Sequence, residues 1–97
     1  MNRAAVLRLI AERRDELRQR FGAHSLALFG SAARDEMRED SDIDVLVEFD
    51  GPATFDGYVA LKDYLEELFG AKVDLATEAM IKPRLRRYIE KDLLRVA

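Results

Sequence analysis

The sequence predicts a small mixed α/β domain of the α+β class, with one β-sheet of three or more strands packed against helices. Short apolar runs alternate with longer amphipathic stretches in the order α-β-α-β-α-β-α, and glycine or proline separates most of them. The chain has 97 residues, of which 48% are hydrophobic and 36% charged. This length supports one modest core, so we expect a single domain over residues 1–97.

The N-terminal stretch is predicted to be one amphipathic helix over residues 2–21. Its apolar side chains recur every three or four positions, Asn2 is a suitable N-cap and Gly22 a suitable stop. A short apolar strand is expected next, over residues 25–29, because glycines bound it on both sides.

The middle of the chain is predicted to form a short helix and then a strand. The helix covers residues 31–37 and has Ser31 as its N-cap. The strand covers residues 42–49 and has the clearest alternation in the sequence, because one face is wholly apolar while the other carries Asp42 and Asp44.

The second half is predicted to hold two further helices and a third strand. Thr54 is a suitable N-cap for a helix over residues 55–69, which Gly70 ends. Residues 71–76 form the strand, and Pro83 suits the first turn of the last helix. The apolar stripe of that last helix is Leu85, Ile89 and Leu93.

Composition excludes several classes of protein. No apolar run approaches the roughly 20 residues that a membrane helix needs, and charged residues near the N-terminus exclude a secretory signal. The chain has no cysteine for disulfides or thiolate metal sites, and its single histidine leaves little for a zinc site. We therefore expect a cytoplasmic protein.

Charge is distributed unevenly along the chain. Residues 1–21 carry six arginines against three acids, and residues 82–97 carry six basic residues against two acids. Because the net charge is −3, residues 22–81 carry −10. An acidic centre favours a cation site, so direct nucleic-acid binding is not expected. The basic last helix is a solvated face, a docking face or a nucleotide contact.

Three aspartates form a candidate metal site. Asp42 and Asp44 point to the same side of one strand, with their Cα atoms roughly 6–7 Å apart. Two carboxylates on one face repel each other unless a cation lies between them, and their hard oxygens suit Mg²⁺. With Asp74 on a neighbouring strand, three carboxylates could hold two ions about 3.5–4 Å apart. Asp42 could instead be a turn cap, but aspartate is disfavoured inside strands, which weakens that alternative for the other two.

A glycine and a serine at the expected strand–helix junction form a candidate phosphate-binding turn. Gly30 lets a phosphate approach the backbone, and Ser31 offers a hydroxyl donor. The N-terminus of the helix adds free N–H groups. A purely structural N-cap role for Ser31 explains the same residue without a ligand.

Two motifs carry a resemblance to a known family. Residues 30–34 (Gly-Ser-Ala-Ala-Arg) and 41–47 (Ser-Asp-Ile-Asp-Val-Leu-Val) resemble the signature of minimal nucleotidyltransferases, in the DNA polymerase β-like nucleotidyltransferase superfamily. Asp74 matches the third carboxylate of that family, and residues 81–85 resemble its last helix. The resemblance implies the nucleotidyltransferase fold and transfer of a nucleotidyl group from a nucleoside triphosphate to an acceptor hydroxyl.

The resemblance also implies roles for individual residues. Asp42 and Asp44 bind both Mg²⁺ ions, and Asp74 completes the metal site and serves as a base toward the acceptor. Gly30 and Ser31 hold the β- and γ-phosphates of ATP.

The next two residues leave open questions. Arg34 either contacts phosphate or braces the loop by pairing with a carboxylate. Asp35 departs from many relatives, which have glycine after that arginine. Its negative charge is expected to weaken nucleotide binding unless it points to solvent.

Many minimal nucleotidyltransferases are antitoxins paired with a HEPN-domain ribonuclease toxin, and they transfer AMP from ATP to a tyrosine of the toxin. The resemblance therefore implies a HEPN toxin partner, in a hetero-oligomer, or a second copy of the chain as the source of the acceptor. Two alternatives stay open: an antitoxin that neutralises its toxin by binding alone, and a transferase for a small molecule such as an aminoglycoside.

Overall fold

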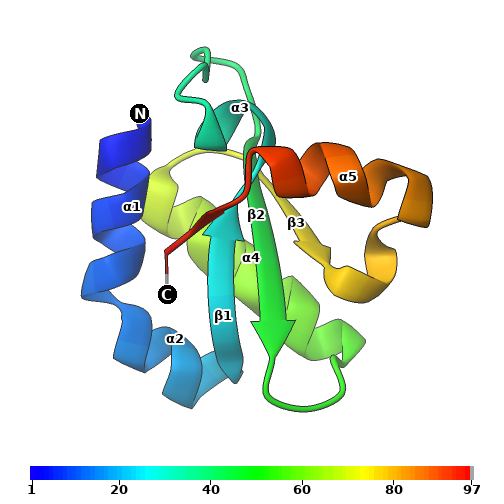
Figure 1. Cartoon of the computed structure of the whole chain (residues 1–97). Helices are drawn as coiled ribbons and strands as arrows, with labels where there is room; N and C mark the ends of the chain where they lie inside the picture. The colour runs from blue at the N-terminus through cyan, green and yellow to red at the C-terminus, as the bar shows by residue number, and fades with distance from the viewer. Residues whose placement is uncertain (97) are drawn as a thin grey trace.

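The computed structural model describes residues 1–96 and contains one four-stranded sheet with helices packed on it (Figure 1). The strands are β1 (Ala23–Leu28), β2 (Ile43–Phe49), β3 (Val73–Thr77) and β4 (Leu94–Arg95). The helices are α1 (Arg3–Glu12), α2 (Arg14–Phe21), α3 (Gly30–Ala33), α4 (Phe55–Phe69) and α5 (Pro83–Lys91), and a 3₁₀ turn, η1 (Glu78–Met80), follows β3. No helix in this part of the chain is long and apolar enough to cross a membrane.

The sheet is mixed, as the sequence predicted, with the strand order β3-β2-β1-β4. The central strands β1 and β2 are antiparallel, whereas β3 runs parallel to β2. The parallel pairing requires a crossover, and α4 provides it. The register of β2 and β3 places Asp44 directly opposite Asp74.

One face of the sheet carries the hydrophobic core. Helices α1, α2 and α4 contribute fully buried side chains to it, and the apolar faces of the strands supply the rest (Figure 1). The predicted alternation in β2 and β3 is confirmed, because their valine and isoleucine side chains and Leu75 enter this core, whereas Leu46 does not. The buried strand residues are Leu26, Leu28, Ile43, Val45, Val47, Val73 and Leu75.

The predicted caps of two helices are confirmed. The side chain of Asn2 accepts a hydrogen bond from the N–H of Ala5, and that of Thr54 accepts one from Gly57. Helix α4 has the predicted bounds and ends at Gly70 in a left-handed conformation with φ +64°.

The predicted single helix over residues 2–21 is wrong, because the chain forms two helices that meet at Arg13. The break occurs where two consecutive arginines interrupt the apolar stripe. It lets both halves reach the core, since Ile10 before the break and Leu17 after it are fully buried.

The predicted helix over residues 31–37 is also wrong in its bounds. Helix α3 covers only four residues, begins at Gly30 and has Phe29 at the N-cap position, so Ser31 is not the N-cap. It ends early because Asp35 has a φ of +59°, which a right-handed helix cannot continue.

Two further predicted boundaries need correction, one of a strand and one of a helix. Strand β2 begins at Ile43, so Asp42 lies just before it instead of within it. The last helix does not extend to Leu93, because α5 ends at Lys91 and the chain then forms β4. Strand β4 pairs with the outer edge of β1 over only two residues, which is too short to produce an alternating pattern in the sequence.

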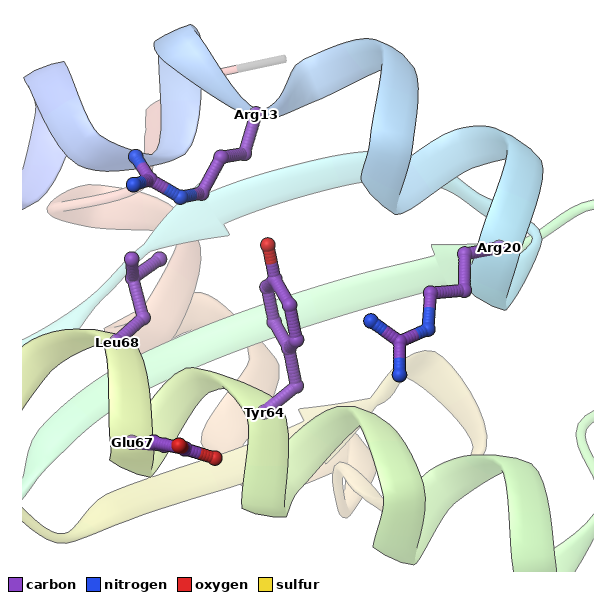
Figure 2. Close-up of a pocket in the computed structure, with 5 residues that line it drawn as sticks. All are labelled: Arg13, Arg20, Tyr64, Glu67 and Leu68. Atoms are coloured by element: carbon purple, nitrogen blue, oxygen red, sulfur yellow. The ribbon is translucent and has the colours of Figure 1, made fainter.

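Helices α2 and α4 meet on the core side of the molecule, where Arg20 of α2 lies near Tyr64 of α4 (Figure 2). The rings of Phe21 and Tyr64 lie 5.0 Å apart between centroids, and the guanidinium of Arg20 lies over both rings. The Tyr64 hydroxyl donates a 2.7 Å hydrogen bond to Glu16. A hollow of about 320 Å³ lies here, and three of its polar side chains, Arg13, Arg20 and Tyr64, have partners within the protein.

Candidate active site

The candidate site lies on the opposite face of the sheet, at the ends where β2 and β3 begin. Alternation along the strands turns Asp44 and Asp74 away from the core. Because the two residues are cross-strand partners, the fold brings together two carboxylates that are 30 positions apart in the sequence. This is the pairing that the sequence predicted for adjacent strands.

The electrostatic environment raises the pKa of Asp44 from 3.8 to about 6. The largest cause is burial of the carboxyl group, followed by the charge of Asp74 and a side-chain hydrogen bond to it. The charge of Asp42 adds to the increase, and only Arg34 opposes it. The site therefore holds more negative charge than the protein itself neutralises.

Asp42 is exposed and precedes the strand, so it does not join the Asp44–Asp74 pair in the backbone ladder. Across residues 1–96, no three Asp, Glu, His or Cys side chains lie close enough together to hold one metal ion. The donor chemistry nevertheless fits Mg²⁺, which takes one or two carboxylates and keeps waters and phosphates as its other ligands. The negative charge of Asp74 and Asp42, which adds to burial in raising the pKa of Asp44, is the charge that a cation would neutralise.

Gly30 lies directly against Asp44. Its φ is +59°, and a Cβ atom at this position would collide with the Asp44 carboxylate, lying 3.2 Å from its Cγ. The backbone reinforces the contact, because the N–H of Phe29 donates a 3.1 Å hydrogen bond to the carbonyl of Asp44. The turn and the aspartate strand therefore form one unit, in which glycine is needed for both its backbone conformation and its lack of a side chain. Ser31 follows in this turn and is half-buried.

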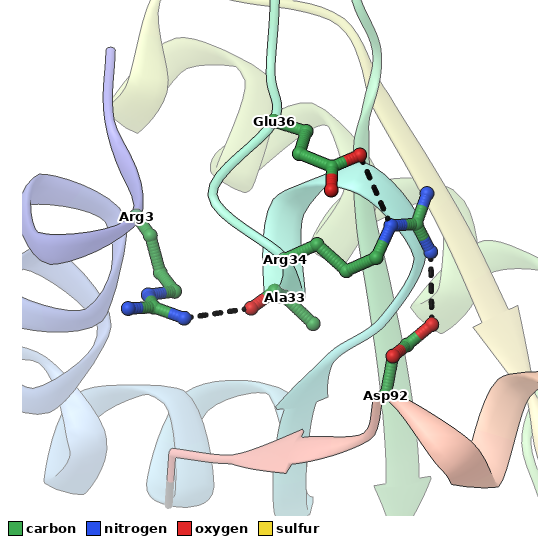
Figure 3. Close-up of polar contacts among 5 residues, drawn as sticks. All are labelled: Arg3, Ala33, Arg34, Glu36 and Asp92. Atoms are coloured by element: carbon green, nitrogen blue, oxygen red, sulfur yellow. Dashed lines mark hydrogen bonds and ion pairs between the residues drawn. The ribbon is translucent and has the colours of Figure 1, made fainter.

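Arg34 pairs with two carboxylates (Figure 3). Its Nη1 lies 2.9 Å from Asp92, just after α5, and its Nε lies 3.3 Å from Glu36. The hydrogen bonds to Asp92 and then Glu36 raise the pKa of the guanidinium above its usual value. The structure thus contains the bracing contact that was one of the two expected roles. No sequence signal identified Asp92, because the pair is separated by 58 residues.

Asp35 has a structural partner that the sequence did not indicate. Its carboxylate accepts a 2.9 Å hydrogen bond from the backbone N–H of Arg3, at the start of α1. The Arg3 side chain donates in turn to the carbonyl of Ala33, at 2.9 Å (Figure 3). The exposed charge of Asp35 is therefore directed at a helix N-terminus, where negative charge is favourable.

Helix α4 holds β3 on either side of Asp74. The Tyr58 hydroxyl donates to the carbonyl of Leu75, and Glu66 accepts a 2.9 Å hydrogen bond from the N–H of Val73. Sequence reasoning missed both contacts, because an isolated Tyr or Glu on a helix gives no sign of its partner. They fix the strand that presents the second carboxylate.

Comparisons with known proteins identify the family. The family model described as "Nucleotidyltransferase domain" matches residues 10–96. The protein adenylyltransferase MntA of Thermococcus cleftensis is 34% identical over 88 residues, covering 91% of this chain and 89% of the relative. A Methanocaldococcus jannaschii protein, provisionally named a protein adenylyltransferase, is 46% identical over 83 residues, covering 82% of this chain and 83% of the relative.

Solved structures have the same fold. A structure provisionally described as a minimal nucleotidyltransferase matches with a TM-score of 0.81 and 39% identity, covering 97% of this chain and 95% of the other. A Shewanella oneidensis complex of a HEPN toxin with an MNT antitoxin matches with a TM-score of 0.66 and 17% identity, covering 94% and 71%. The predicted nucleotidyltransferase fold is confirmed, and the chain belongs to the nucleotidyltransferase domain family as a minimal nucleotidyltransferase.

Proposed function

We propose that the protein is a Mg²⁺-dependent protein adenylyltransferase that transfers AMP from ATP to a partner protein. The observation that carries this proposal is the Asp44–Asp74 pair beneath the Gly30 turn. Paired carboxylates supply the metal-binding half of such a site, and a glycine turn open to phosphate supplies the nucleotide-binding half. Relatives at 34% and 46% identity carry the name protein adenylyltransferase.

In this proposal each group of residues has a distinct task. Asp42, Asp44 and Asp74 hold two Mg²⁺ ions, which neutralise charge on the phosphates when bound. Asp74 also accepts the proton of the acceptor hydroxyl, because it is the more exposed member of the strand pair. Gly30 and Ser31 orient the β- and γ-phosphates, so that pyrophosphate leaves as the acceptor oxygen bonds to the α-phosphorus.

Arg34 has a positioning role and lies beside the site. Its pairing with Asp92 fixes the end of α5 relative to the turn that follows α3. Its positive charge also lowers the pKa of Asp44, which favours the ionised carboxylate that a metal ion requires.

The partner in this proposal is a HEPN-type toxin, and the acceptor is a tyrosine hydroxyl of that toxin. Structural neighbours include a tri-AMPylated HEPN toxin in complex with an MNT antitoxin, and a toxin–antitoxin complex with AMP-PNP. Both support an antitoxin that uses ATP and acts within a hetero-oligomer. We place this protein in the cytoplasm, where ATP and a ribonuclease toxin would meet.

The test is adenylyl transfer to the product of the neighbouring reading frame, using labelled ATP and Mg²⁺. Wild-type protein is expected to label the partner, whereas the double variant Asp42→Asn/Asp44→Asn loses about a hundredfold or more of the rate. Asp40→Asn is the matched control, because Asp40 is an exposed aspartate two residues before Asp42. It should retain wild-type transfer.

The alternatives give different results in the same assay. Neutralisation of the toxin that survives the double substitution, with no label transferred, would establish an antitoxin that acts by binding alone. Transfer to an aminoglycoside but not to the partner protein would establish a small-molecule transferase. Either result would overturn the proposal.

A further inference from the structure

Helix α5 runs alongside the candidate site but is only loosely attached. It leaves η1 at the far end of β3 and returns to Asp92, whose carboxylate contacts Arg34 (Figure 3). None of its residues is buried. Ion pairs hold both of its ends, since Arg86 lies 3.0 Å from Glu78 while Asp92 holds Arg34.

Tyr88 lies on this helix, one turn before Asp92. Residues four apart share a helix face and are separated by about 6 Å along the axis. Tyr88 therefore faces the same side as the residue that contacts Arg34. Arg34 follows Gly30 by one helical turn, and Gly30 lies against Asp44, so the end of α5 that carries Asp92 lies beside the candidate site.

The three tyrosines of the chain differ in how their hydroxyls are used. Tyr58 donates to the carbonyl of Leu75, and Tyr64 donates to Glu16. Tyr88 is 72% exposed, and no hydrogen bond among residues 1–96 involves its hydroxyl. It is therefore the phenol that is available as a nucleophile near the site.

The surroundings of Tyr88 favour the approach of a nucleotide. Arg84, Arg87 and Lys91 lie on the same helix, are exposed, and form no ion pair with another described residue. Positive charge of this kind attracts the triphosphate of ATP to the helix. The site itself is acidic, so α5 adds positive charge beside it.

We propose that Tyr88 is an acceptor for the protein's own adenylyl transfer, within the same chain, so that the enzyme modifies itself when no partner is bound. This inference rests on the proposed function. The phenol oxygen of Tyr88 forms a bond to the α-phosphorus of ATP, and the bond from that phosphorus to the oxygen bridging to the β-phosphate breaks. Pyrophosphate leaves with the electron pair, and the phenol proton passes to the carboxylate of Asp74.

The test incubates the full chain alone with labelled ATP and Mg²⁺, followed by intact-mass analysis and peptide mapping. Wild-type protein should gain one AMP, on the peptide that contains Tyr88. Tyr88→Phe should lose about tenfold or more of this label, because it lacks the nucleophilic oxygen. Tyr64→Phe is the matched control, since Tyr64 lies on the opposite side of the sheet, and it should keep the label.

The transfer is expected to occur within one chain. In a mixture of active Tyr88→Phe protein and ¹⁵N-labelled Asp42→Asn/Asp44→Asn protein, the inactive copy should stay unmodified although it retains Tyr88. Label on the inactive copy would overturn transfer within one chain.

A parallel assay with the partner protein separates this inference from the proposed function. Tyr88→Phe should still label the partner, which shows that its site is intact. Partner labelling without any self-labelling of wild-type protein, or self-labelling that persists in Tyr88→Phe, overturns the role of Tyr88 alone. Absence of transfer to either acceptor overturns both proposals.

Discussion

At the residue scale, Gly30 is required for two separable reasons. Gly30→Ala should lower stability by about 1–2 kcal/mol because of the left-handed backbone, and it should also displace the Asp44 carboxylate. Gly70→Ala is a matched control, because Gly70 has φ +64° and nothing within 4 Å of an added Cβ. Urea unfolding should show similar losses for both variants, whereas adenylyl transfer should fall only for Gly30→Ala. Equal activity in the two variants would contradict a role for the Gly30–Asp44 contact.

The pKa of Asp44 makes a second prediction, about stability in the absence of metal. Because this pKa rises from 3.8 to about 6 on folding, the group stabilises the protein fully below pH 3.8 and loses that contribution as pH rises through about 6. Asp44→Asn should therefore unfold at higher urea than wild type at pH 8 in EDTA, by about 1 kcal/mol after allowance for solvent screening. The advantage should disappear near pH 4. Identical urea midpoints of the variant and the wild type at pH 8 would show that ionised Asp44 does not destabilise the folded protein.

The site residues were predictable where a local pattern carries the chemistry. The Asp-x-Asp motif and the Gly-Ser turn are each contiguous, and alternation alone assigns Asp44 and Asp74 to one face. The contact between Arg34 and Asp92 was not predictable, because it joins distant segments and no periodicity links them. The same is true of the Tyr58 hydrogen bond to β3.

At the element scale, Asp35 links helix α1 to the turn after α3. Asp35→Ala should cost about 1–2 kcal/mol, because it removes the acceptor for the Arg3 N–H while keeping a residue with φ +59°. Asp35→Gly should cost less, since glycine relieves the backbone strain as the hydrogen bond is lost. Urea unfolding measures both changes, and amide hydrogen exchange should show a more open first turn of α1. A larger loss in Asp35→Gly than in Asp35→Ala would contradict this account.

Element boundaries were predictable where a cap or a long period marks them. Helix α4 has the predicted bounds because Thr54 and Gly70 mark its ends and four turns share one apolar face. The predictions for the short elements were wrong because neither a cap nor a long period marks them. Helix α3 has four residues and β4 has two, so tertiary contacts define them rather than periodicity.

At the scale of the whole molecule, the acidic centre between basic ends predicts a specific response to divalent cations. The middle segment, residues 22–81, carries −10, and its most confined negative charge is at Asp44. Mg²⁺ at about ten times its dissociation constant should add roughly 1.4 kcal/mol of stability, which raises the Tm of a domain this size by about 5–10 °C. NaCl at matched ionic strength screens the general repulsion but does not fill the site, so it should raise the Tm by much less. Differential scanning calorimetry of the protein, with EDTA as the reference, measures both shifts.

Variants of the acidic motif test whether Mg²⁺ binds at one site or only screens the overall negative charge of the segment. Asp42→Asn/Asp44→Asn removes two carboxylates from the start of β2 and should abolish the Mg²⁺-induced increase in Tm. Asp40→Asn removes a neighbouring exposed charge and should leave the increase intact, because Asp40 lies outside the strand pair. Equal loss of the increase in the single and double variants would mean that Mg²⁺ responds to the overall charge of the segment. Loss of the increase in the double variant alone would mean that Mg²⁺ binds where β2 and β3 begin side by side, because the fold brings carboxylates together there.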